Sequence, residues 1–326
     1  MSFKPRRNTY KPVPTYVEIE TTIMCNASCW FCPQKNSLRT PKYMEDKVWK
    51  KIIDDTRNIG AIYRPFLLNE PFADKRMTEI VSYIKQDPTA KVEFNTNASM
   101  LTPKVSDQLI ALGVDVMRFS IDGFYRETFD ESRGISYDKV YQHVAYFLQQ
   151  CKKSKRDIAT EVRMIKLPNT ENEQIKFKEY WEKHQPDNII FTDLYSYPWE
   201  KQSGPTNLPC LKIEKELFFY VDGTATLCCW DSIGRQIIGD IRTENALDIW
   251  NGVEMNRCRN LLDKGEREKL NLCSRCDAYT GTDFSEWAGF EYDPNQKNIV
   301  SKSIEQKQKY FELKPEKYEK SGVLEK

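Results

Sequence analysis

Strand-like segments rich in β-branched and aromatic residues alternate with amphipathic, helix-like segments along the first two thirds of the chain. The expected strands cover residues 15–23, 65–68, 91–95, 114–121, 158–167 and 189–194. Helical spacing between them predicts helices over residues 44–59, 75–84, 103–113, 137–150 and 170–181. Such alternation is typical of a parallel sheet with helices outside it. Because eight units close a TIM barrel and this chain shows six, we expect an α/β fold with a partial, open (β/α)6 barrel.

Two of these helices carry recognisable start and stop signals. Thr102 followed by Pro103 is typical of an N-cap and a first helical residue, and Gly113 is typical of a C-cap. Thr170 and Glu173 have the spacing of a capping box. In barrels of this type the chemistry lies where the strands end, so polar residues at those ends are candidates for the site.

The pattern changes after about residue 203. Residues 217–221 and 225–229 flank Asp222 and Gly223, which predicts a two-stranded hairpin, and a helix is expected over residues 246–262. The last residues are rich in Lys, Glu and Gln and predict a solvated helix or a disordered end. We therefore expect a barrel domain over residues 1–202, an extension over residues 203–294 and a charged tail over residues 295–326.

Composition excludes several classes of protein. The 326 residues include 49 Lys+Arg and 48 Asp+Glu, a net charge of +1, so no strong field would attract a nucleic acid or an anionic membrane. The hydrophobic share of 40% suits a packed core, but no apolar stretch is long enough to span a membrane. The basic N-terminus lacks the apolar run of a signal peptide, so we expect a cytoplasmic protein.

Ten cysteines are therefore the informative residues. In a reducing cytoplasm, clustered cysteines are more often metal ligands or redox centres than disulfides. Three of them, Cys25, Cys29 and Cys32, follow the first expected strand directly. Three thiolates on one loop can bind three irons of a [4Fe–4S] cluster and leave the fourth iron open. Zinc is the alternative, but a closed structural zinc site needs a fourth ligand nearby.

The C-x3-C-x2-C loop after the first strand resembles the cluster-binding loop of the radical S-adenosylmethionine (SAM) superfamily. Phe31 occupies the position of the aromatic residue that precedes the third cysteine in the family. Asn69, Glu70 and Pro71 resemble the Gly-Gly-Glu element whose backbone receives the SAM amino group, with Asn69 in place of a glycine.

Later strand ends continue the resemblance. Residues 95–97, which end in Asn97, resemble the T-N-G segment of the third strand. Residues 120–123 resemble the fourth-strand motif that contacts the SAM ribose and carboxylate, with Ser120 and Asp122 as its polar members. Arg163 on the fifth strand is a candidate partner for a carboxylate through bidentate pairing.

This resemblance implies a reductive reaction. The open iron would bind the amino and carboxyl groups of SAM, and one electron would break the sulfonium bond to give methionine and a 5′-deoxyadenosyl radical. That radical would remove hydrogen from an unactivated C–H bond of the substrate. A flavodoxin or ferredoxin-type protein is the expected electron donor.

A second group of cysteines lies in the extension and consists of Cys210, Cys228, Cys273 and Cys276. Four thiolates complete either a zinc site or a fully ligated [4Fe–4S] cluster, and their spacing does not separate the two. The surrounding residues 219–276 resemble the SPASM/twitch extension of radical SAM enzymes, which carries auxiliary clusters. Because no cysteine follows Cys276, we expect one auxiliary [4Fe–4S] cluster, as in the twitch type found in an aminocyclitol dehydrogenase.

Three cysteines remain: Cys151, Cys229 and Cys258. A free cysteine most often serves as a small buried hydrophobe. The alternative for Cys229 or Cys258 is the thiol of a radical epimerase, which returns hydrogen to the opposite face of the substrate.

Four functions are compatible with these features. We favour oxidation of a small hydroxylated substrate, a sugar or aminocyclitol, with the auxiliary cluster as electron acceptor. The alternatives are an epimerase, a maturase of a ribosomally made peptide and a non-enzymatic zinc module. The 24 residues before Cys25 are fewer than the leader-binding domain of many maturases, and a zinc module leaves the three-cysteine loop unexplained. Candidate substrate contacts are Tyr63, Arg64, Glu70, Asn95, Arg163, Asp193 and Tyr195.

Overall fold

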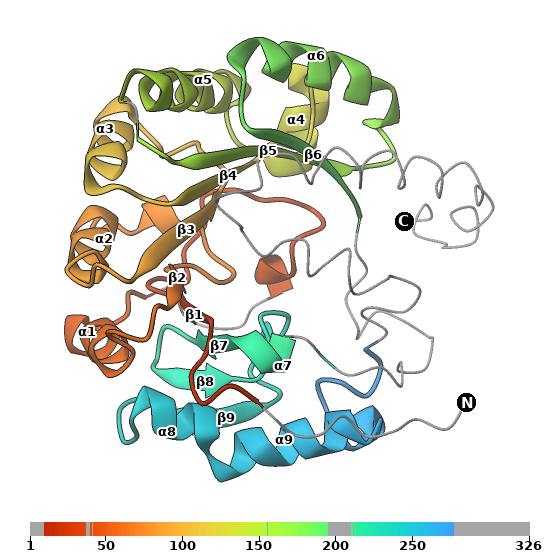
Figure 1. Ribbon diagram of the computed structural model, residues 1–326. Helices are drawn as coiled ribbons and strands as arrows, with labels where there is room; N and C mark the ends of the chain where they lie inside the picture. Colours follow the sequence, from red (N-terminus) through yellow and green to blue (C-terminus); the bar gives the residue numbers. More distant parts are fainter. Residues whose placement is uncertain are drawn as a thin grey trace. The chain divides into compact units, whose positions relative to one another are not determined.

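The computed structural model describes residues 10–36, 40, 42–154, 156–194, 210 and 212–276. Its centre is one nine-stranded sheet with the strand order β6-β5-β4-β3-β2-β1-β7-β8-β9 (Figure 1). The first six strands form the barrel part, and their neighbours all pair in parallel. They are β1 (Tyr16–Ile19), β2 (Ile62–Arg64), β3 (Lys91–Thr96), β4 (Val116–Ser120), β5 (Ala159–Lys166) and β6 (Asn188–Asp193).

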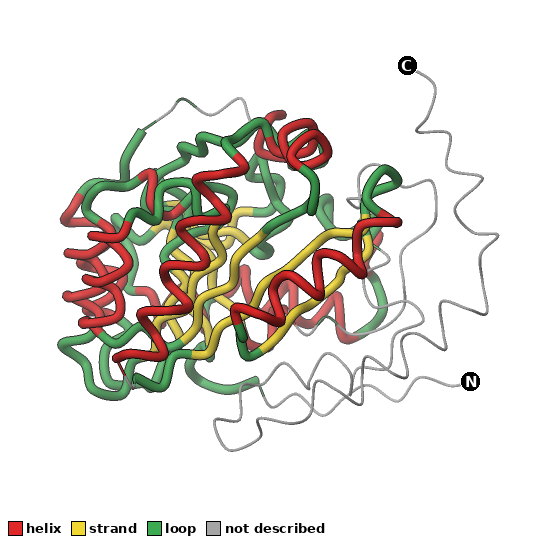
Figure 2. Tube along the Cα trace, turned by 90° about the horizontal axis from the view of Figure 1, so that it is seen from above, coloured by secondary structure: helices red, strands yellow, loops and turns green. Residues whose placement is uncertain are grey.

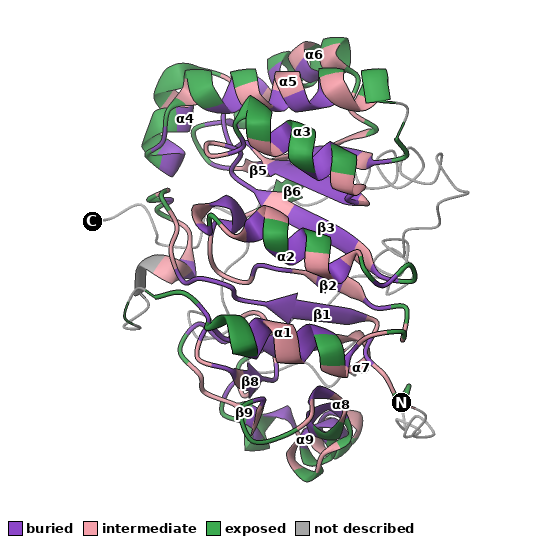
Figure 3. Ribbon diagram, turned by 90° about the vertical axis from the view of Figure 1, so that its left-hand side faces the viewer, coloured by how far each residue is buried: buried purple, intermediate pink, exposed green. Residues whose placement is uncertain are grey.

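Helices cover one face of this parallel sheet (Figures 1 and 2). Those between the barrel strands are α1 (Asp46–Asp55), α2 (Met77–Ile84), α3 (Pro103–Leu112), α4 (Arg126–Arg133), α5 (Tyr137–Ser154) and α6 (Gln174–His184). The strands beneath them are buried, whereas the outward faces of the helices are exposed (Figure 3). The expected open (β/α)6 barrel is thus confirmed.

The two faces of the sheet differ in chemistry because successive strand residues point to opposite sides. On the helix side lie apolar residues that are almost fully buried, such as Val92, Phe119 and Met164. Phe119, for example, packs edge to face against Phe147 of α5, with ring centroids 5.5 Å apart. The opposite face, which none of the described helices α1 to α6 covers, carries the charged residues of the site.

The signals at the ends of α3 are confirmed. Thr102 caps the helix by accepting a hydrogen bond from the Val105 N–H, Pro103 is the first helical residue, and Gly113 ends it with φ of 72°. The capping box at Thr170 is wrong. The Thr170 hydroxyl accepts from the Leu167 N–H at 3.1 Å, and the Glu173 carboxylate accepts from the backbone N–H groups of Phe124 and Tyr125.

Two further expectations about the barrel need correction. The second strand is Ile62–Arg64, whereas residues 65–68 follow it as a loop. Helix α4, which no sequence pattern predicted, stands between β4 and α5. Its sequence is mostly polar, but Phe129 and Arg133 are buried against the barrel, and its end lies beside the first cysteine loop.

The extension continues the same sheet. It contains α7 (Lys212–Lys215), β7 (Glu216–Phe219), β8 (Thr224–Thr226) and β9 (Ile237–Asp240), followed by α8 (Ala246–Asn251) and α9 (Val253–Asp263). The expected hairpin is confirmed as the antiparallel pair β7 and β8, and β7 also pairs in parallel with β1. The single helix expected over residues 246–262 is two helices, because the chain turns at Gly252, where a side chain would lie 2.8 Å from the Asp248 carbonyl oxygen.

Short 3-10 helices complete the described part of the chain: η1 (Pro33–Asn36), η2 (Pro71–Ala73), η3 (Glu171–Glu173) and η5 (Arg267–Lys269). Within the described residues, no helix has both the length and the apolar character that crossing a membrane requires.

Candidate functional site

The first cysteine group lies on the loop that leaves β1 at the carboxyl edge of the barrel. Within the loop, the Cys32 N–H donates to the Cys29 carbonyl oxygen at 3.1 Å. The loop is attached to the end of α4, since the Ser28 N–H donates to the Arg133 carbonyl oxygen at 2.8 Å. Gly134 has φ of +63° and allows this approach, because a side chain there would collide with the Ser28 hydroxyl.

The three thiols form one electrostatic group. The pKa of Cys25 is raised to about 12, mainly by burial and also by the charges of Glu70, Cys29 and Cys32. Burial also raises the pKa of Cys29, whereas the Arg133 guanidinium lowers it. Among the described residues, no three Cys, His, Asp or Glu side chains are arranged around a point that would hold a single metal ion. A [4Fe–4S] cluster binds each thiolate through a different iron, so the donor set fits such a cluster.

Glu70, which follows β2, connects the neighbouring loops. Its carboxylate accepts hydrogen bonds from the Thr96 hydroxyl at 2.6 Å, the Asn97 N–H at 2.8 Å and the Phe72 N–H at 3.2 Å. Its own N–H donates to the Met24 carbonyl oxygen, next to the first cysteine. Glu70 therefore holds the loops after β1, β2 and β3 together, and its carboxylate is already occupied by protein donors.

The side chain of Asn97 reaches the cysteine loop. Its amide nitrogen lies 4.0 Å from the Cys25 sulfur and 3.2 Å from the Asn26 side-chain oxygen. Asn69 accepts from the Leu67 N–H through its oxygen, but its side-chain nitrogen is buried and has no hydrogen-bond partner. Pro71 opens η2, and Phe31 is half-buried and packs edge to face against Trp30.

Glu70 gives a prediction for pH dependence. Burial raises its pKa to about 7 in the folded protein, from an ordinary value of 4.5, despite the opposing hydrogen bonds. Between these two values the folded state binds more protons than the unfolded state, so this group's contribution to stability falls as the pH rises, by about 3 kcal/mol in all. We expect the free energy of unfolding of the wild type, minus that of Glu70→Gln, to decrease by this amount between pH 4.5 and 7.5. Denaturant titrations at several pH values test this, and a difference that stays constant over the range would contradict it.

Asp122 and Arg133 form a buried ion pair beside the same loop. The Asp122 carboxylate accepts from the Arg133 guanidinium and, at 2.7 Å, from the Ile165 N–H. The second terminal nitrogen of Arg133 lies 3.8 Å from the Cys29 sulfur. Asp122 thus bonds to the protein through both oxygens, and its predicted contact with SAM stays a prediction.

A chain of alternating charges crosses the inner face of the barrel. Arg64 lies between Glu18, at 2.9 Å, and Glu93, at 3.1 Å. Glu93 also accepts a hydrogen bond from Arg118 at 2.9 Å, and Arg118 in turn donates to Glu161 at 3.2 Å. Unpaired buried charges cost several kcal/mol, so alternation of sign is what allows five charged side chains to share this face.

Arg163 extends this charge chain toward the carboxyl ends of the strands. It donates twice to Glu161, at 2.9 and 2.6 Å, and its side chain keeps 25% of its surface exposed. Burial lowers the pKa of Arg163, Glu161 raises it, and the nearby cations Arg118 and Arg64 lower it. On neighbouring strands at this level lie Ser120, opposite Arg163 in register, and Asn95, whose side-chain oxygen is buried without a hydrogen-bond partner.

Not every predicted substrate contact lies on this face. Tyr63 is wrong, because it points to the helix side, where its hydroxyl bonds to the Thr56 hydroxyl and carbonyl oxygens at 2.8 and 2.9 Å. Asp193 is exposed at the end of β6 and pairs with Lys166 at 3.2 Å. Tyr195 lies outside the described residues.

The second cysteine group also comes together. Burial raises the pKa of Cys273, and the charges of Cys210 and Cys276 raise it further. A hydrogen bond with Cys229 and burial raise the pKa of Cys228, which also interacts with Cys210. Electrostatic interactions therefore link the four predicted ligands, although they come from three separate segments of the extension.

The remaining cysteines have distinct surroundings. Cys258 is fully buried on α9, 3.8 Å from a Glu254 carboxylate oxygen, and interacts with Cys273. Cys229 adjoins Cys228, as its sequence position requires. Cys151 lies near the end of α5, and burial raises its pKa to about 12.

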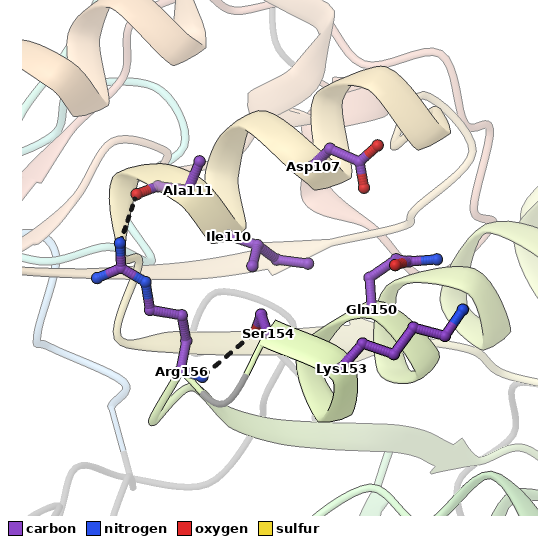
Figure 4. A pocket seen from close by; sticks show the side chains of 7 residues that line it. All are labelled: Asp107, Ile110, Ala111, Gln150, Lys153, Ser154 and Arg156. Atoms are coloured by element: carbon purple, nitrogen blue, oxygen red, sulfur yellow. Dashed lines mark hydrogen bonds between the residues drawn. The ribbon is translucent and has the colours of Figure 1, made fainter.

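A separate pocket of about 330 Å³ lies between α3 and α5 on the helix side (Figure 4). Both helices approach their C-terminal ends there, so the pocket is at the opposite edge of the barrel from the cysteine loop. It is lined by Asp107, Ile110, Ala111, Gln150, Lys153, Ser154 and Arg156.

Sequence reasoning missed Arg133 and the inner charges other than Arg64 and Arg163. A signal existed for the charges. Glu93, Arg118 and Glu161 each stand next to apolar strand residues that point to the other side, such as Val92, Met117 and Val162, and this alternation indicates one polar face. Arg133 lies in a polar helix, where nothing local marks it as buried.

Two family models match the chain. Residues 19–177 match the radical SAM superfamily, and residues 210–277 match an iron–sulfur cluster-binding domain, SPASM. The S-adenosyl-L-methionine-dependent 2-deoxy-scyllo-inosamine dehydrogenase of Niallia circulans is 22% identical over 270 residues, which cover 80% of this chain and 92% of that protein.

Solved structures share the fold. BtrN in complex with AdoMet and 2-DOIA superposes with a TM-score of 0.57 at 18% identity, covering 82% of this chain and 94% of BtrN. Streptococcus suis SuiB bound to the precursor peptide SuiA gives a TM-score of 0.63 at 11% identity, covering 82% of this chain and 75% of SuiB.

The fold, the three-cysteine loop and the two family matches agree with one another. The matched domains are those that use SAM and iron–sulfur clusters, and they occupy the expected order along the chain. The protein is therefore an enzyme of the radical SAM superfamily, with a radical SAM domain followed by an iron–sulfur cluster-binding SPASM domain.

Proposed function

We propose that this enzyme oxidises a small hydroxylated substrate, a sugar or an aminocyclitol. The observation that carries the proposal is the polar inner face of the barrel, with Arg163 and Glu161 on the strand that ends near the cysteine loop. Paired charges and an unpartnered amide oxygen at Asn95 suit a ligand rich in hydroxyl or amino groups. The likeness to the Niallia circulans dehydrogenase over most of the chain supports this substrate class.

Cys25, Cys29 and Cys32 would hold the cluster that binds SAM. When bound and reduced, this cluster and SAM supply the removal of hydrogen from an unactivated C–H bond. Asn69, in the loop after β2 where SAM is expected, has a buried and unpartnered side-chain N–H donor. Such a donor suits an acceptor atom of SAM, and this supports the assignment of that loop to SAM. Glu70 and Asp122 would act mainly by fixing the loops around it. A flavodoxin or ferredoxin-type protein would supply the electron.

Oxidation of an alcohol removes two electrons and two protons, so a second electron acceptor is needed. We propose that Cys210, Cys228, Cys273 and Cys276 hold one auxiliary [4Fe–4S] cluster for this purpose. The position of Cys258 supports oxidation over epimerisation, because this thiol is buried beside Cys273 and hydrogen-bonded to Glu254. Cys229 stays the candidate thiol for an epimerase.

The decisive experiment is product analysis with a candidate aminocyclitol in deuterated water. The proposal expects a ketone and one 5′-deoxyadenosine per turnover, with no deuterium on carbon. Solvent deuterium at an inverted carbon would instead identify an epimerase. Turnover of a peptide, with no reaction of cyclitols or sugars, would identify a maturase.

Arg163 is expected to orient the substrate through its guanidinium. Replacing it with glutamine removes a charged, bidentate donor, and loss of alignment at a reacting centre costs about 100-fold in rate. We therefore expect Arg163→Gln to reduce ketone formation about 100-fold, whereas cleavage of SAM without substrate persists. Quantifying ketone and 5′-deoxyadenosine separately tests this.

The matched control is Arg156→Gln, which changes an arginine in the pocket of Figure 4. This variant should form ketone at the wild-type rate. If Arg163→Gln lost SAM cleavage as well as ketone formation, Arg163 would belong to the SAM site and its proposed contact with substrate would be wrong.

A further inference from the structure

The end of α4 places one buried cation against the first cysteine group. Arg133 is 6% exposed, and one of its terminal nitrogens lies 3.8 Å from the Cys29 sulfur. The guanidinium carbon lies 5.9 Å from the centre of the Phe31 ring, which belongs to the same cysteine loop. The guanidinium is therefore enclosed by protein where it meets the thiol.

Two further contacts fix this arrangement. The Arg133 carbonyl oxygen accepts from the Ser28 N–H, so the backbone of α4 and the backbone of the cysteine loop cannot move apart independently. The other end of the guanidinium donates to Asp122, which is anchored by the Ile165 N–H. The distance from the positive charge to Cys29 is thus set by α4, the loop after β4 and strand β5.

The third donor of Arg133 is unused. Its Nε atom is buried and has no hydrogen-bond partner. A buried donor without a hydrogen-bond partner lowers the stability of the folded protein. An arginine that has partners for only two of its three nitrogens at this position therefore points to a role beyond packing.

A cation and a hydrogen-bond donor at a cysteine ligand stabilise the more negative, reduced state of an iron–sulfur cluster. The effect is larger in a buried site, where solvent screens charge poorly. The Asp122 carboxylate acts in the opposite direction, because it neutralises part of the Arg133 charge.

We propose that Arg133 is a positioning residue that raises the reduction potential of the cluster held by Cys25, Cys29 and Cys32, and that Asp122 moderates this effect. The inference rests on the proposed function, since it requires a cluster at these three thiols. Helix α4 thereby helps to control how readily the enzyme accepts its first electron.

The test is a redox titration followed by electron paramagnetic resonance on the reconstituted full-length enzyme. The signal that changes when SAM is added identifies the cluster of the first cysteine group. We expect Arg133→Gln to shift the midpoint potential of this signal to a more negative value and Arg133→Lys to give a smaller shift of the same sign. Asp122→Asn should shift it to a more positive value.

The control is Arg126→Gln, which removes the same charge from the exposed start of α4, where Arg126 pairs with Asp138. Its potential should equal that of the wild type. The inference would be overturned if the potentials of Arg133→Gln and Asp122→Asn both matched this control. It would also be overturned if both potentials shifted in the same direction. If Arg133→Gln does not retain iron, the opposite shifts of Arg133→Lys and Asp122→Asn decide the question. Failure of the wild type to load a SAM-responsive cluster would instead refute the proposed function.

Discussion

Replacing Cys25, Cys29 and Cys32 together with alanine is expected to abolish cleavage of SAM. With two [4Fe–4S] clusters, the wild type should bind about eight irons and eight sulfides per chain after anaerobic reconstitution. The triple variant should keep about four of each, because the second cysteine group comes from other segments. Complete loss is expected because the triple variant lacks all three proposed ligands of the cluster on which SAM cleavage depends.

Iron and sulfide assays, combined with measurement of 5′-deoxyadenosine, test this prediction. Cys151→Ala is the matched control, since Cys151 is a partly buried thiol that belongs to neither group. It should retain about eight irons and wild-type cleavage. If the triple variant still cleaved SAM, the cluster that binds SAM could not be held by this loop.

The double variant Cys273→Ala/Cys276→Ala is expected to separate the two halves of the reaction. Both thiols are buried in the second group, and their loss removes two of four ligands from one cluster. Iron should fall to about four per chain, SAM cleavage should persist, and ketone formation should fall at least about 100-fold. The remaining 5′-deoxyadenosine would then form without a matching amount of product.

Metal analysis of the wild type completes this test. Zinc in place of iron at the second group would show that its four thiolates have a structural role. Ketone formation at the wild-type rate by the double variant would show that the second electron leaves by another path. Either result would refute the proposed acceptor.

The barrel was predictable because most of its strands follow a strong apolar pattern. Residues such as Val92 and Phe94 face the helices and are fully buried, so the hydrophobic signal is large. The second strand was misplaced for the opposite reason. Its inner residue is Arg64, held between Glu18 and Glu93, and a charge in a three-residue strand hides the apolar alternation.

Errors elsewhere came from contacts made at long range. Glu173 has the spacing of a capping residue, but its carboxylate reaches back to the loop before α4, about 50 residues earlier in the chain. Arg133 is polar in a polar helix, and only the folded structure brings it to Cys29. The cysteines of each group, by contrast, are visible in the sequence together with their spacing, so both groups could be proposed without the structure.

The parallel pairing of β7 with β1 has a consequence for how the protein can be divided. β1 leads directly into the first cysteine loop, and its residues from Tyr16 to Ile19 pair with β7 on one side and, over most of their length, with β2 on the other. Without the extension, β1 would become an exposed edge strand with apolar side chains, the kind of edge along which chains stick to one another. The SPASM domain therefore covers an edge of the radical SAM domain that would otherwise be open to aggregation, at the strand from which the first cysteine loop departs.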